Sequence, residues 1–381
     1  MKKIAIIGAN EYQQKLVLKA KDLGFETHVF AWEDGAVAKD NADYFYPISI
    51  TDKDRIYHIL EEINVNGVCS IASDLAMPTV NYIAEKLNLA GNSIESTILT
   101  TNKYEMRKKL NEHHLPVPAY QLIKEAKEAN NNLSYPLIVK PIDRSGSRGI
   151  YKVHNKDELT VAINKAKKVS FTEEILIEDY IVGEEYSIEA ISQNGEHHIL
   201  QITEKFTTES PNFIEMGHLS PARIDDELKD RILKVVDQSL TALKVRNGAS
   251  HSEVKVTESG EIIIIEVAAR MGGDFIGSDM VQITTNFDYV KSVLQIAMGE
   301  IIDLNYKPSN KYAFVRFIFN QDDINIFNSI KREYSLSVKE YTFNKKFHDV
   351  TDSSTRNGYY ILELCSDRQM NDILQLLEID K

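Results

Sequence analysis

Cysteine is scarce in this chain of 381 residues, since only Cys69 and Cys365 are present. Two cysteines so far apart do not form a disulfide framework, and no CxxC pair offers a thiolate metal site. We therefore expect two reduced and mostly buried thiols. A Walker-type GxxxxGK(S/T) motif and a zinc-binding HExxH motif are absent as well, so neither a P-loop enzyme nor a zinc protease of that class is indicated.

Positive charge and long apolar runs are also limited. There are 44 lysines and arginines against 57 aspartates and glutamates, which gives a formal net charge of -13. A surface of this sign repels nucleic acid, and no polybasic cluster for binding lipid is present. No apolar stretch approaches the roughly 20 residues that span a bilayer, and the early run IAII ends at Gly8, too short for a signal peptide. We therefore expect a cytoplasmic protein without nucleic-acid or membrane partners.

The order of the expected elements divides the chain into four units. Apolar strands such as KKIAIIG, ETHVFAW and NGVCSIA alternate with helical patterns, which indicates a Rossmann-like parallel sheet covered by helices on both faces. Later strands look antiparallel, for example ILIEDYI with EEYSIEAIS, joined at Val182-Gly183. The last strands and a closing helix are typical of a small α+β domain. The fold class is thus α/β and α+β, and the predicted units are residues 1–98, 99–182, 183–305 and 306–381.

A lysine before a flexible loop gives the first functional hint. The stretch IVKPIDRSGSRGI ends an apolar strand at Lys140 and continues over residues 143–149 as a loop of arginine, serine and glycine. A fixed ammonium beside free backbone N–H groups suits the phosphates of a nucleotide. A solvated strand end followed by a turn is the alternative, and this stretch alone does not decide between them.

Two glutamates in a predicted hairpin give the strongest signal. In HSEVKVTESGEIIIIEVAARMGG, two strands flank Ser259-Gly260, which we expect to form a two-residue turn. With that turn, Glu253 lies directly opposite Glu266 on one face of the hairpin. Two carboxylates in an apolar setting need a shared proton or a cation, and Mg²⁺ held by carboxylates and substrate phosphates fits. If the register slips by one residue, one glutamate points to solvent instead.

Two neighbouring stretches add weaker signals. Arg270 leaves the strand of Glu266 and is placed to clamp a phosphoryl oxygen, although an ordinary strand-ending turn is the alternative. The segment ILIEDYIVGEEYSIE runs from Glu178 through a kink to Glu185. Such a connection offers backbone groups to a flat heterocycle, and Glu185 is placed to accept from sugar hydroxyls. Taken alone, this segment is only a hairpin with surface acids.

Taken in order along the chain, these features resemble the ATP-grasp superfamily over about residues 1 to 300. The tail after residue 306 resembles the extra domain of the L-amino-acid ligases, and NFIEMGHLSPA resembles their Glu-x-Gly-His-x-x-Pro segment. The resemblance implies an ATP-grasp fold with a Rossmann-like N-terminal domain and a small C-terminal α+β domain. It also implies an ATP-dependent carboxylate–amine ligase that joins small molecules, in particular amino acids, through an acyl phosphate.

The resemblance assigns nucleotide contacts to individual residues. Lys103 and Lys140 would hold the α- and β-phosphates of ATP. Glu178 and the backbone of Ile181 would contact the adenine edge, and Glu185 would bind the ribose. The mobile loop that would close over the phosphates contains Ser145, Gly146 and Ser147.

The metal and substrate contacts are implied in the same way. Mg²⁺ or Mn²⁺ would be held by Glu253 and Glu266, and Arg270 would stabilise the phosphoryl and tetrahedral oxygens as the catalytic residue. The residues that would contact the carboxylate and amine substrates are Glu215, His218, Gly272, Gly273, Ser73 and Asp74. The other nine histidines are expected to be structural or at the surface, and a homodimer is the default expectation.

One departure from the family pattern and two other functions remain. The family commonly has Glu-x-Asn-x-Arg at the second metal ligand, whereas Ala268 stands at the Asn position here and removes a neutral oxygen ligand. A purine-pathway type of ATP-grasp ligase, using a carboxy or formyl phosphate, is the first alternative. The second is a non-catalytic nucleotide- or NAD-binding relative. A dinucleotide fingerprint would need glycines at positions 10 and 13 after Gly8, where Asn10 and Gln13 stand instead.

Overall fold

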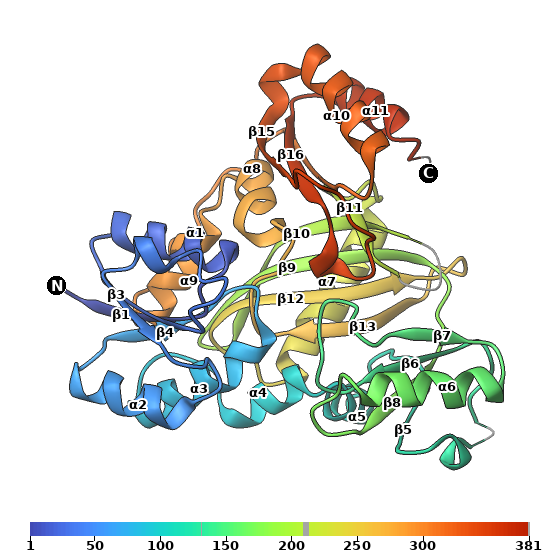
Figure 1. Ribbon diagram of the computed structural model, residues 1–381, viewed down its shortest axis with the longest axis horizontal. Helices are drawn as coiled ribbons and strands as arrows, with labels where there is room; N and C mark the ends of the chain where they lie inside the picture. Colours follow the sequence, from blue (N-terminus) through green and yellow to red (C-terminus); the bar gives the residue numbers. More distant parts are fainter. Residues whose placement is uncertain (131, 209–212, 380–381) are drawn as a thin grey trace.

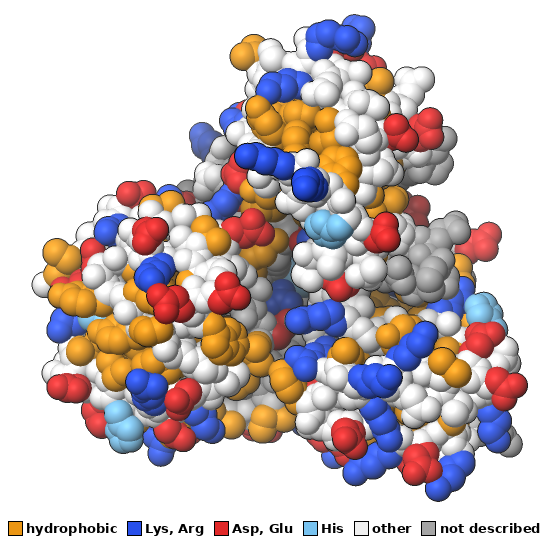
Figure 2. Space-filling view, viewed as in Figure 1, with side chains coloured by type: hydrophobic (Ala, Val, Ile, Leu, Met, Phe, Trp, Pro, Cys, Tyr) orange, Lys and Arg blue, Asp and Glu red, His pale blue; other side chains and the backbone are white. Residues whose placement is uncertain are grey.

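Three β-sheets organise the chain, as the computed structural model shows (Figure 1). The structure describes residues 1–130, 132–208 and 213–379. No helix among these residues has both the length and the apolar composition needed to cross a membrane. The three sheets meet around a hollow at the centre of the molecule, visible in Figure 2 with lysine and arginine side chains at its rim.

The N-terminal sheet is entirely parallel, with the order β3-β2-β1-β4. The strand–helix alternation predicted for this part of the chain is therefore confirmed. Helix α1 is fixed at its start by a capping box, in which the Asn10 side chain accepts from backbone N–H groups. The elements of this part are β1 (Lys3–Ile7), α1 (Glu11–Asp22), β2 (Glu26–Ala31), β3 (Tyr44–Pro47), α2 (Lys53–Glu62), β4 (Gly67–Cys69), α3 (Met77–Lys86) and α4 (Ile94–Thr101).

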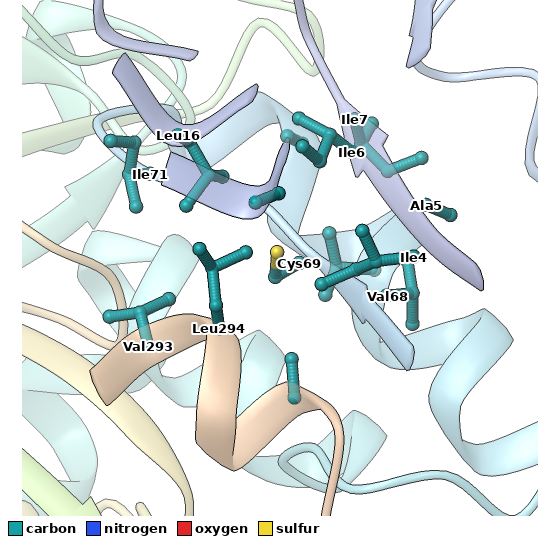
Figure 3. Close-up of a cluster of buried hydrophobic side chains, with 14 of the residues drawn as sticks. Ile4, Ala5, Ile6, Ile7, Leu16, Val68, Cys69, Ile71, Val293 and Leu294 are labelled. Carbon is teal, nitrogen blue, oxygen red and sulfur yellow. The ribbon is translucent and has the colours of Figure 1, made fainter. Parts of the chain in front are cut away.

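A distant helix completes the core of this parallel sheet. Helix α9 (Tyr289–Ala297) packs against α1 and β4. Its Val293 and Leu294 lie in the same buried cluster as Ile4 and Leu16 (Figure 3). The N-terminal unit therefore takes part of its core from a segment late in the sequence. The prediction of two buried thiols is half right, because Cys69 is buried in this core and Cys365 is exposed.

The second sheet is small and antiparallel, with the order β5-β8-β6-β7. The predicted pairing of ILIEDYI with EEYSIEAIS is wrong. Strand β8 lies between β5 and β6, while β9 lies between β10 and β12 of the next sheet, so both already have two neighbours. Residues 180–183 connect the two sheets instead of turning a hairpin. The elements here are α5 (Lys103–Glu112), β5 (Tyr120–Ile123), β6 (Leu137–Pro141), β7 (Tyr151–Val153), α6 (Lys156–Lys167) and β8 (Ile175–Asp179).

The third sheet has eight strands in the order β13-β12-β9-β10-β11-β14-β16-β15. The C-terminal strands extend it through pairing of β14 with β11. The strands are β9 (Glu184–Gln193), β10 (Glu196–Thr207), β11 (Glu215–Ser220), β12 (Gly248–Val256), β13 (Ile262–Ala268), β14 (Tyr312–Phe317), β15 (Val338–Phe343) and β16 (Gly358–Leu364). The remaining helices are α7 (Asp226–Ala242), α8 (Val281–Thr285), α10 (Gln321–Glu333) and α11 (Asp367–Leu376).

The β12–β13 hairpin pairs Glu253 with Glu266, as predicted, although its turn differs from the prediction. The loop has three residues, with Gly260 at φ +80°, the left-handed conformation that glycine adopts most easily. Next to this loop, the strand pairing is one residue out of the predicted register. A β-bulge beside Glu253 restores the predicted register, so that Glu253 and Glu266 still pair. The bulge leaves Ile265 outside the strand pairing, between two residues that do have partners.

Candidate active site

The predicted nucleotide and metal residues surround one cavity of about 170 Å³ between the small sheet and the edge of the large sheet. Its lining includes Lys140, Ser145, Gly146, Ser147, Glu178, Ile181, Glu185, Glu215, Glu253, Glu266 and Arg270. Lys103 reaches the same place, because its Nζ donates to Glu266 Oε1 at 2.7 Å. Residues that are up to 167 positions apart in the sequence, counted from Lys103 to Arg270, are thus brought together.

A larger cavity of about 590 Å³ adjoins the first and shares Glu215, Glu253 and Arg270 with it. Three more of the predicted substrate residues line this larger cavity, namely Asp74, His218 and Gly273. Its other walls come from both ends of the chain, since helix α1 and the loop before β16 contribute side chains. The two cavities together form a site with a narrow part and a wide part.

Each of the paired glutamates is held by a lysine. Glu266 accepts from Lys103, and Glu253 Oε1 accepts from Lys205 Nζ at 2.9 Å. Burial alone would raise the pKa of Glu253, but Lys205 and a neighbouring histidine outweigh it and hold this pKa well below its usual range. Each carboxylate therefore has a lysine partner.

Lys205 is the centre of this charge cluster, and the sequence analysis missed it. Its Nζ lies 2.7 Å from Glu185, 2.9 Å from Glu253 and 3.4 Å from Glu215. Burial lowers the pKa of Lys205, yet the three carboxylates more than compensate and raise it well above the usual value. Lys205 could have been found from the sequence, because it is a lysine in the strand β10. A lysine in an apolar strand was also the reason for selecting Lys140.

The two glutamates suit a divalent ion only together with further oxygen ligands. No group of three or more His, Cys, Asp or Glu side chains that could hold a metal ion exists in the described part of the chain. Mg²⁺ is commonly bound by one or two carboxylates plus substrate phosphates, so Glu253 and Glu266 fit this donor set. Lys103 and Lys205 donate hydrogen bonds to these carboxylates and supply positive charge beside them.

The carboxylate of Glu178 forms an ion pair with Arg107, a residue that was not predicted from the sequence. Arg107 Nε donates to Glu178 Oε1 at 2.5 Å, and Lys140 Nζ lies 2.5 Å from Oε2. The same guanidinium donates to the carbonyl oxygen of Ile265, the residue that the bulge leaves without a strand partner. Burial opposes ionisation of Glu178, but the two cations lower its pKa. Its carboxylate is thus engaged within the protein, and the backbone near Ile181 is the remaining candidate for the predicted adenine contact.

Arg270 is held from one edge by an aspartate. Its Nε and Nη2 donate to the two carboxylate oxygens of Asp74 at 2.8 Å each. Nη1 donates to the carbonyl oxygen of Met271 at 3.3 Å. The guanidinium lines both cavities, so it is fixed at their junction. A two-pronged Arg–carboxylate pair of this kind sets the plane of the guanidinium as well as its position.

His251 belongs to the site, which corrects the expectation that every histidine except His218 is structural or at the surface. The ring lies between Glu189, at 2.5 Å from Nδ1, and Glu253, at 3.4 Å from Nε2. Burial lowers the pKa of His251, but these carboxylates raise it to about 9. The position was recognisable, because residues two apart on a strand share a face and His251 precedes Glu253 by two.

The two predicted glycines differ in their surroundings. The backbone N–H of Gly272 donates to buried Glu189 at 3.1 Å, so it is not available to a substrate in this structure. A Cβ at Gly272 would lie 2.3 Å from Glu189 Oε1, which explains why glycine is needed there. Gly273, by contrast, lines the larger cavity.

The 143–149 loop is anchored at both ends. The carbonyl oxygen of Arg144 accepts from Lys103 Nζ at 2.8 Å, and the Ser147 hydroxyl donates to the Phe213 carbonyl oxygen at 3.3 Å. The Arg144 guanidinium stacks on Phe171, with its central carbon 3.4 Å from the centre of the ring. Arg148 remains exposed and lines the larger cavity.

A third cavity, of about 320 Å³, lies at the carboxyl ends of the parallel strands. Ser73 lines this cavity, whereas Asp74 lines both this cavity and the larger one. Trp32, half-exposed after β2, forms part of its wall. Ligands of open α/β sheets commonly bind at this edge.

Comparisons with known proteins identify a matching domain and several related sequences and folds. Residues 133–279 match the family model described as an ATP-grasp domain. The alanine–anticapsin ligase of Bacillus subtilis is 26% identical over 271 residues, which cover 62% of this chain and 57% of that protein. The chain thus spans little more than half the length of this curated relative.

Two solved structures share the fold over nearly the whole chain. An L-amino acid ligase from Bacillus licheniformis superposes with a TM-score of 0.83 at 24% identity, over 99% of this chain and 97% of that one. An N5-carboxyaminoimidazole synthetase from Staphylococcus aureus superposes with a TM-score of 0.79 at 16% identity, over 100% and 97%. Residues 133–279 thus match an ATP-grasp domain, and the superpositions show that the chain shares the fold of these structures over nearly its whole length.

Proposed function

We propose that the protein is an ATP-dependent carboxylate–amine ligase that forms an amide bond, with amino acids as substrates. The observation that carries this proposal is the convergence of the predicted nucleotide and metal residues on one cavity that opens into a second, larger one. Most of the residues predicted to contact ATP line the narrow cavity, and Asp74, His218 and Gly273, predicted to contact the substrates, line the wide one. The similarity to the alanine–anticapsin ligase supports the same class of reaction.

The nucleotide would lie between the small sheet and the β12–β13 hairpin. Lys103 and Lys140 would turn from their glutamate partners to the phosphates, and residues 143–149 would close over them. Lys205 lines both cavities, so it lies within reach of the terminal phosphate. Glu185 would accept from the ribose hydroxyls.

The reaction would proceed in two steps. A carboxylate oxygen of the acid attacks the γ-phosphorus of ATP, the bond to the β–γ bridging oxygen breaks, and ADP leaves. The amine nitrogen then attacks the acyl carbon, the bond between the acyl carbon and the phosphate oxygen breaks, and phosphate leaves as the nitrogen loses its proton. Arg270, fixed by Asp74, would stabilise the charge on the phosphoryl and tetrahedral oxygens. Mg²⁺ held by Glu253 and Glu266 would supply charge neutralisation on the phosphates.

A purine-pathway ligase is the second candidate, since a synthetase of that kind shares the fold. Its substrate would be a ribonucleotide, whose phosphate calls for a cluster of uncompensated cations. The larger cavity instead combines arginines and lysine with Glu11, Asp74, Glu215 and Asp274. This mixed charge favours small zwitterionic substrates over a phosphate ester.

The proposal is tested by trapping the activated acid. The protein, Mg·ATP and single carboxylic acids are incubated with hydroxylamine, and hydroxamate and ADP are measured; pairs of amino acids are then assayed for ADP release. We expect at least one acid to give hydroxamate, and the variants Glu253→Gln and Glu266→Gln to reduce ADP release about 100-fold or more. Glu258→Gln, an exposed glutamate in the turn of the same hairpin, is the matched control and should retain full activity. Absence of hydroxamate and ADP with every acid and amine in the panel would overturn the proposal.

A further inference from the structure

An arginine from the C-terminal part of the chain reaches the larger cavity. Arg356 precedes β16 and lines this cavity beside His218, Asp274 and Phe317. Its side chain is 8% exposed, and its guanidinium carbon lies 3.4 Å from the centre of the Phe317 ring. Stacking on an aromatic face holds the plane of a guanidinium while leaving its edges free for hydrogen bonds.

Asp274 fixes one edge of this guanidinium. Nη1 of Arg356 donates to Asp274 Oδ2 at 2.8 Å, and Nη2 donates to Oδ1 at 2.5 Å. Asp274 is itself held by His218, whose Nε2 lies 3.2 Å from Oδ2, and by the Tyr12 hydroxyl, which accepts from the Asp274 N–H at 3.2 Å. Residues from three distant parts of the sequence therefore set the position of one arginine.

The backbone at Asp274 adopts an unusual conformation, which places this residue beside Arg356. Asp274 has φ 53° and the next residue, Phe275, has φ 62°, so two consecutive residues other than glycine adopt the left-handed conformation. Such conformations are unfavourable outside glycine and persist where the surrounding contacts require them, often at binding sites. In addition, His218 Nδ1 is buried without a hydrogen-bond partner among the described residues. Since His218 lines the larger cavity, this nitrogen can take a partner from within it.

The other edge of the Arg356 guanidinium is open. Asp274 takes the edge formed by Nη1 and Nη2, and Nη1 also donates to the Glu215 carbonyl oxygen at 3.4 Å. Within the described ranges, the Nε–H makes no hydrogen bond and Nη2 has only its Asp274 partner, although guanidinium carries five N–H donors. This second edge matches the two oxygens of a carboxylate, which can bind without displacing Asp274.

Arg356 lies away from the position predicted for the reacting carboxylate. Arg270 lines both cavities and stands at the predicted phosphoryl position, whereas Arg356 lines only the larger one. A second carboxylate, one that is not activated, therefore suits Arg356. A phosphate ester carries up to twice the charge of a carboxylate and would be repelled more strongly by Asp274 and Glu215, so it suits this position less well.

We propose that Arg356 is a specificity-determining residue that binds the non-reacting carboxylate of the amine substrate, and that Asp274 is the positioning residue that presents its open edge. The inference rests on the proposed ligase function and adds which amines the site accepts: those with a free carboxylate next to the amine. An amino acid is accepted, while its primary amide and the corresponding decarboxylated amine are rejected.

Direct binding tests this inference without requiring catalysis. Each common amino acid and its primary amide are titrated by calorimetry into the protein with Mg·ADP. We expect at least one amino acid to bind the wild type about 10- to 100-fold more tightly than its amide, the range for a charge-assisted hydrogen-bonded pair. In Arg356→Met this preference should disappear, while the affinity for Mg·ADP stays unchanged. A wild type that shows no preference, or an Arg356→Met variant that keeps it, overturns the inference.

Turnover and matched variants separate recognition from folding. With an active substrate pair, Arg356→Met should raise KM for the amino acid about 10- to 100-fold with little change in kcat or in KM for ATP. Arg356→Lys, which keeps the charge but loses the planar fork, should recover only part of the selectivity. Arg332→Met removes an exposed arginine of α10 and should behave as the wild type. Failure of the ligase assay with intact amino acid preference in calorimetry would reject the proposed function and retain only the role of Arg356 in binding a carboxylate.

Discussion

Buried charges at the site occur in pairs with defined geometry, and these pairs set the chemistry at the scale of single residues. Asp74 holds Arg270, Asp274 holds Arg356, and in each case the aspartate takes one edge of the guanidinium. Leaving one member of such a pair alone in a buried setting is costly, because an uncompensated charge then remains. The pairs therefore keep the arginines charged and oriented before any substrate binds.

Acid stability provides a test of the Asp274–Arg356 pair. Burial raises the pKa of Asp274, but Arg356 outweighs it and holds this pKa well below the unfolded value of about 3.9. The pair therefore stabilises the fold above that pH, and the contribution is lost as pH falls, because the unfolded chain takes up the proton first. We expect the difference in unfolding free energy between the wild type and Asp274→Asn to shrink by about 1 kcal/mol between pH 5 and pH 3.

Urea denaturation at both pH values, with unfolding followed by circular dichroism, measures this difference. Asp322→Asn, an exposed aspartate in the first turn of α10, is a suitable control, and its difference from the wild type should depend less on pH. A constant difference between the wild type and Asp274→Asn over this range would show that the carboxylate titrates alike in the folded and unfolded states.

Several site residues were predictable because their signal lies in short patterns. Lys140 ends an apolar strand before a serine- and glycine-rich loop, and Glu253 and Glu266 face each other in a recognisable hairpin. Arg107 and Arg356 were not predictable in this way, since their partners lie far away in the sequence and only the tertiary fold places them. The roles of all these residues stay predictions until the experiments above are done.

At the scale of elements, the segment that follows β13 contains several residues with restricted surroundings or backbone conformation. The chain leaves this strand through Arg270, passes Gly272 against Glu189 and His251, and then enters the left-handed residues Asp274 and Phe275. At Gly272 the segment packs closely against Glu189 of β9 and His251 of β12. A small change in this short segment should therefore have a disproportionate effect on stability.

Gly272→Ala tests this packing. The added Cβ would lie 2.3 Å from Glu189 Oε1 and 2.7 Å from His251 Nδ1, so buried groups must move. We expect a loss of about 2–3 kcal/mol in unfolding free energy, measured by urea denaturation at neutral pH. Gly273→Ala is a close control, because its nearest neighbour would be the Cβ of Ala72 at 3.9 Å, and a change within about 0.5 kcal/mol is expected. Equal effects of the two substitutions would contradict this explanation.

The elements also show where pattern reading is reliable and where it fails. The parallel N-terminal sheet was predictable, because strands and helices alternate there with clear apolar periodicity. The pairing of β8 with β9 was predicted wrongly, because sequence neighbours often pair and nothing local shows that each strand is central in a different sheet. Helix α10 was missed although Asn320 and Asp323 form a capping box at its start.

For the whole molecule, the C-terminal strands are continuous with the central sheet. Strand β14 pairs with β11, and Leu219 of β11 shares a buried cluster with Phe314 and Leu362. Residues 306–381, proposed from the sequence as a separate unit, therefore complete a sheet and a core that begin in the preceding unit. The cavity wall near Arg356 depends on the same strands.

A shortened chain tests this continuity. A protein ending at residue 305 would leave β11 as an open edge and expose the apolar side chains that it now buries. We expect this protein to self-associate and to bind a hydrophobic dye, as measured by size-exclusion chromatography with light scattering and by dye fluorescence. A monodisperse monomer with a melting temperature within a few degrees of the full chain would show that the two parts fold independently.

The position of Trp32 has a practical consequence. It is the only tryptophan in the chain, it is half-exposed, and it lines the cavity that shares Asp74 and Arg148 with the larger one. Its indole emission therefore comes from a single known place, in the wall of a cavity that adjoins the larger one. Ligand titrations can be followed optically on the unlabelled protein, and a spectral shift that accompanies loop movement would be read from one chromophore alone.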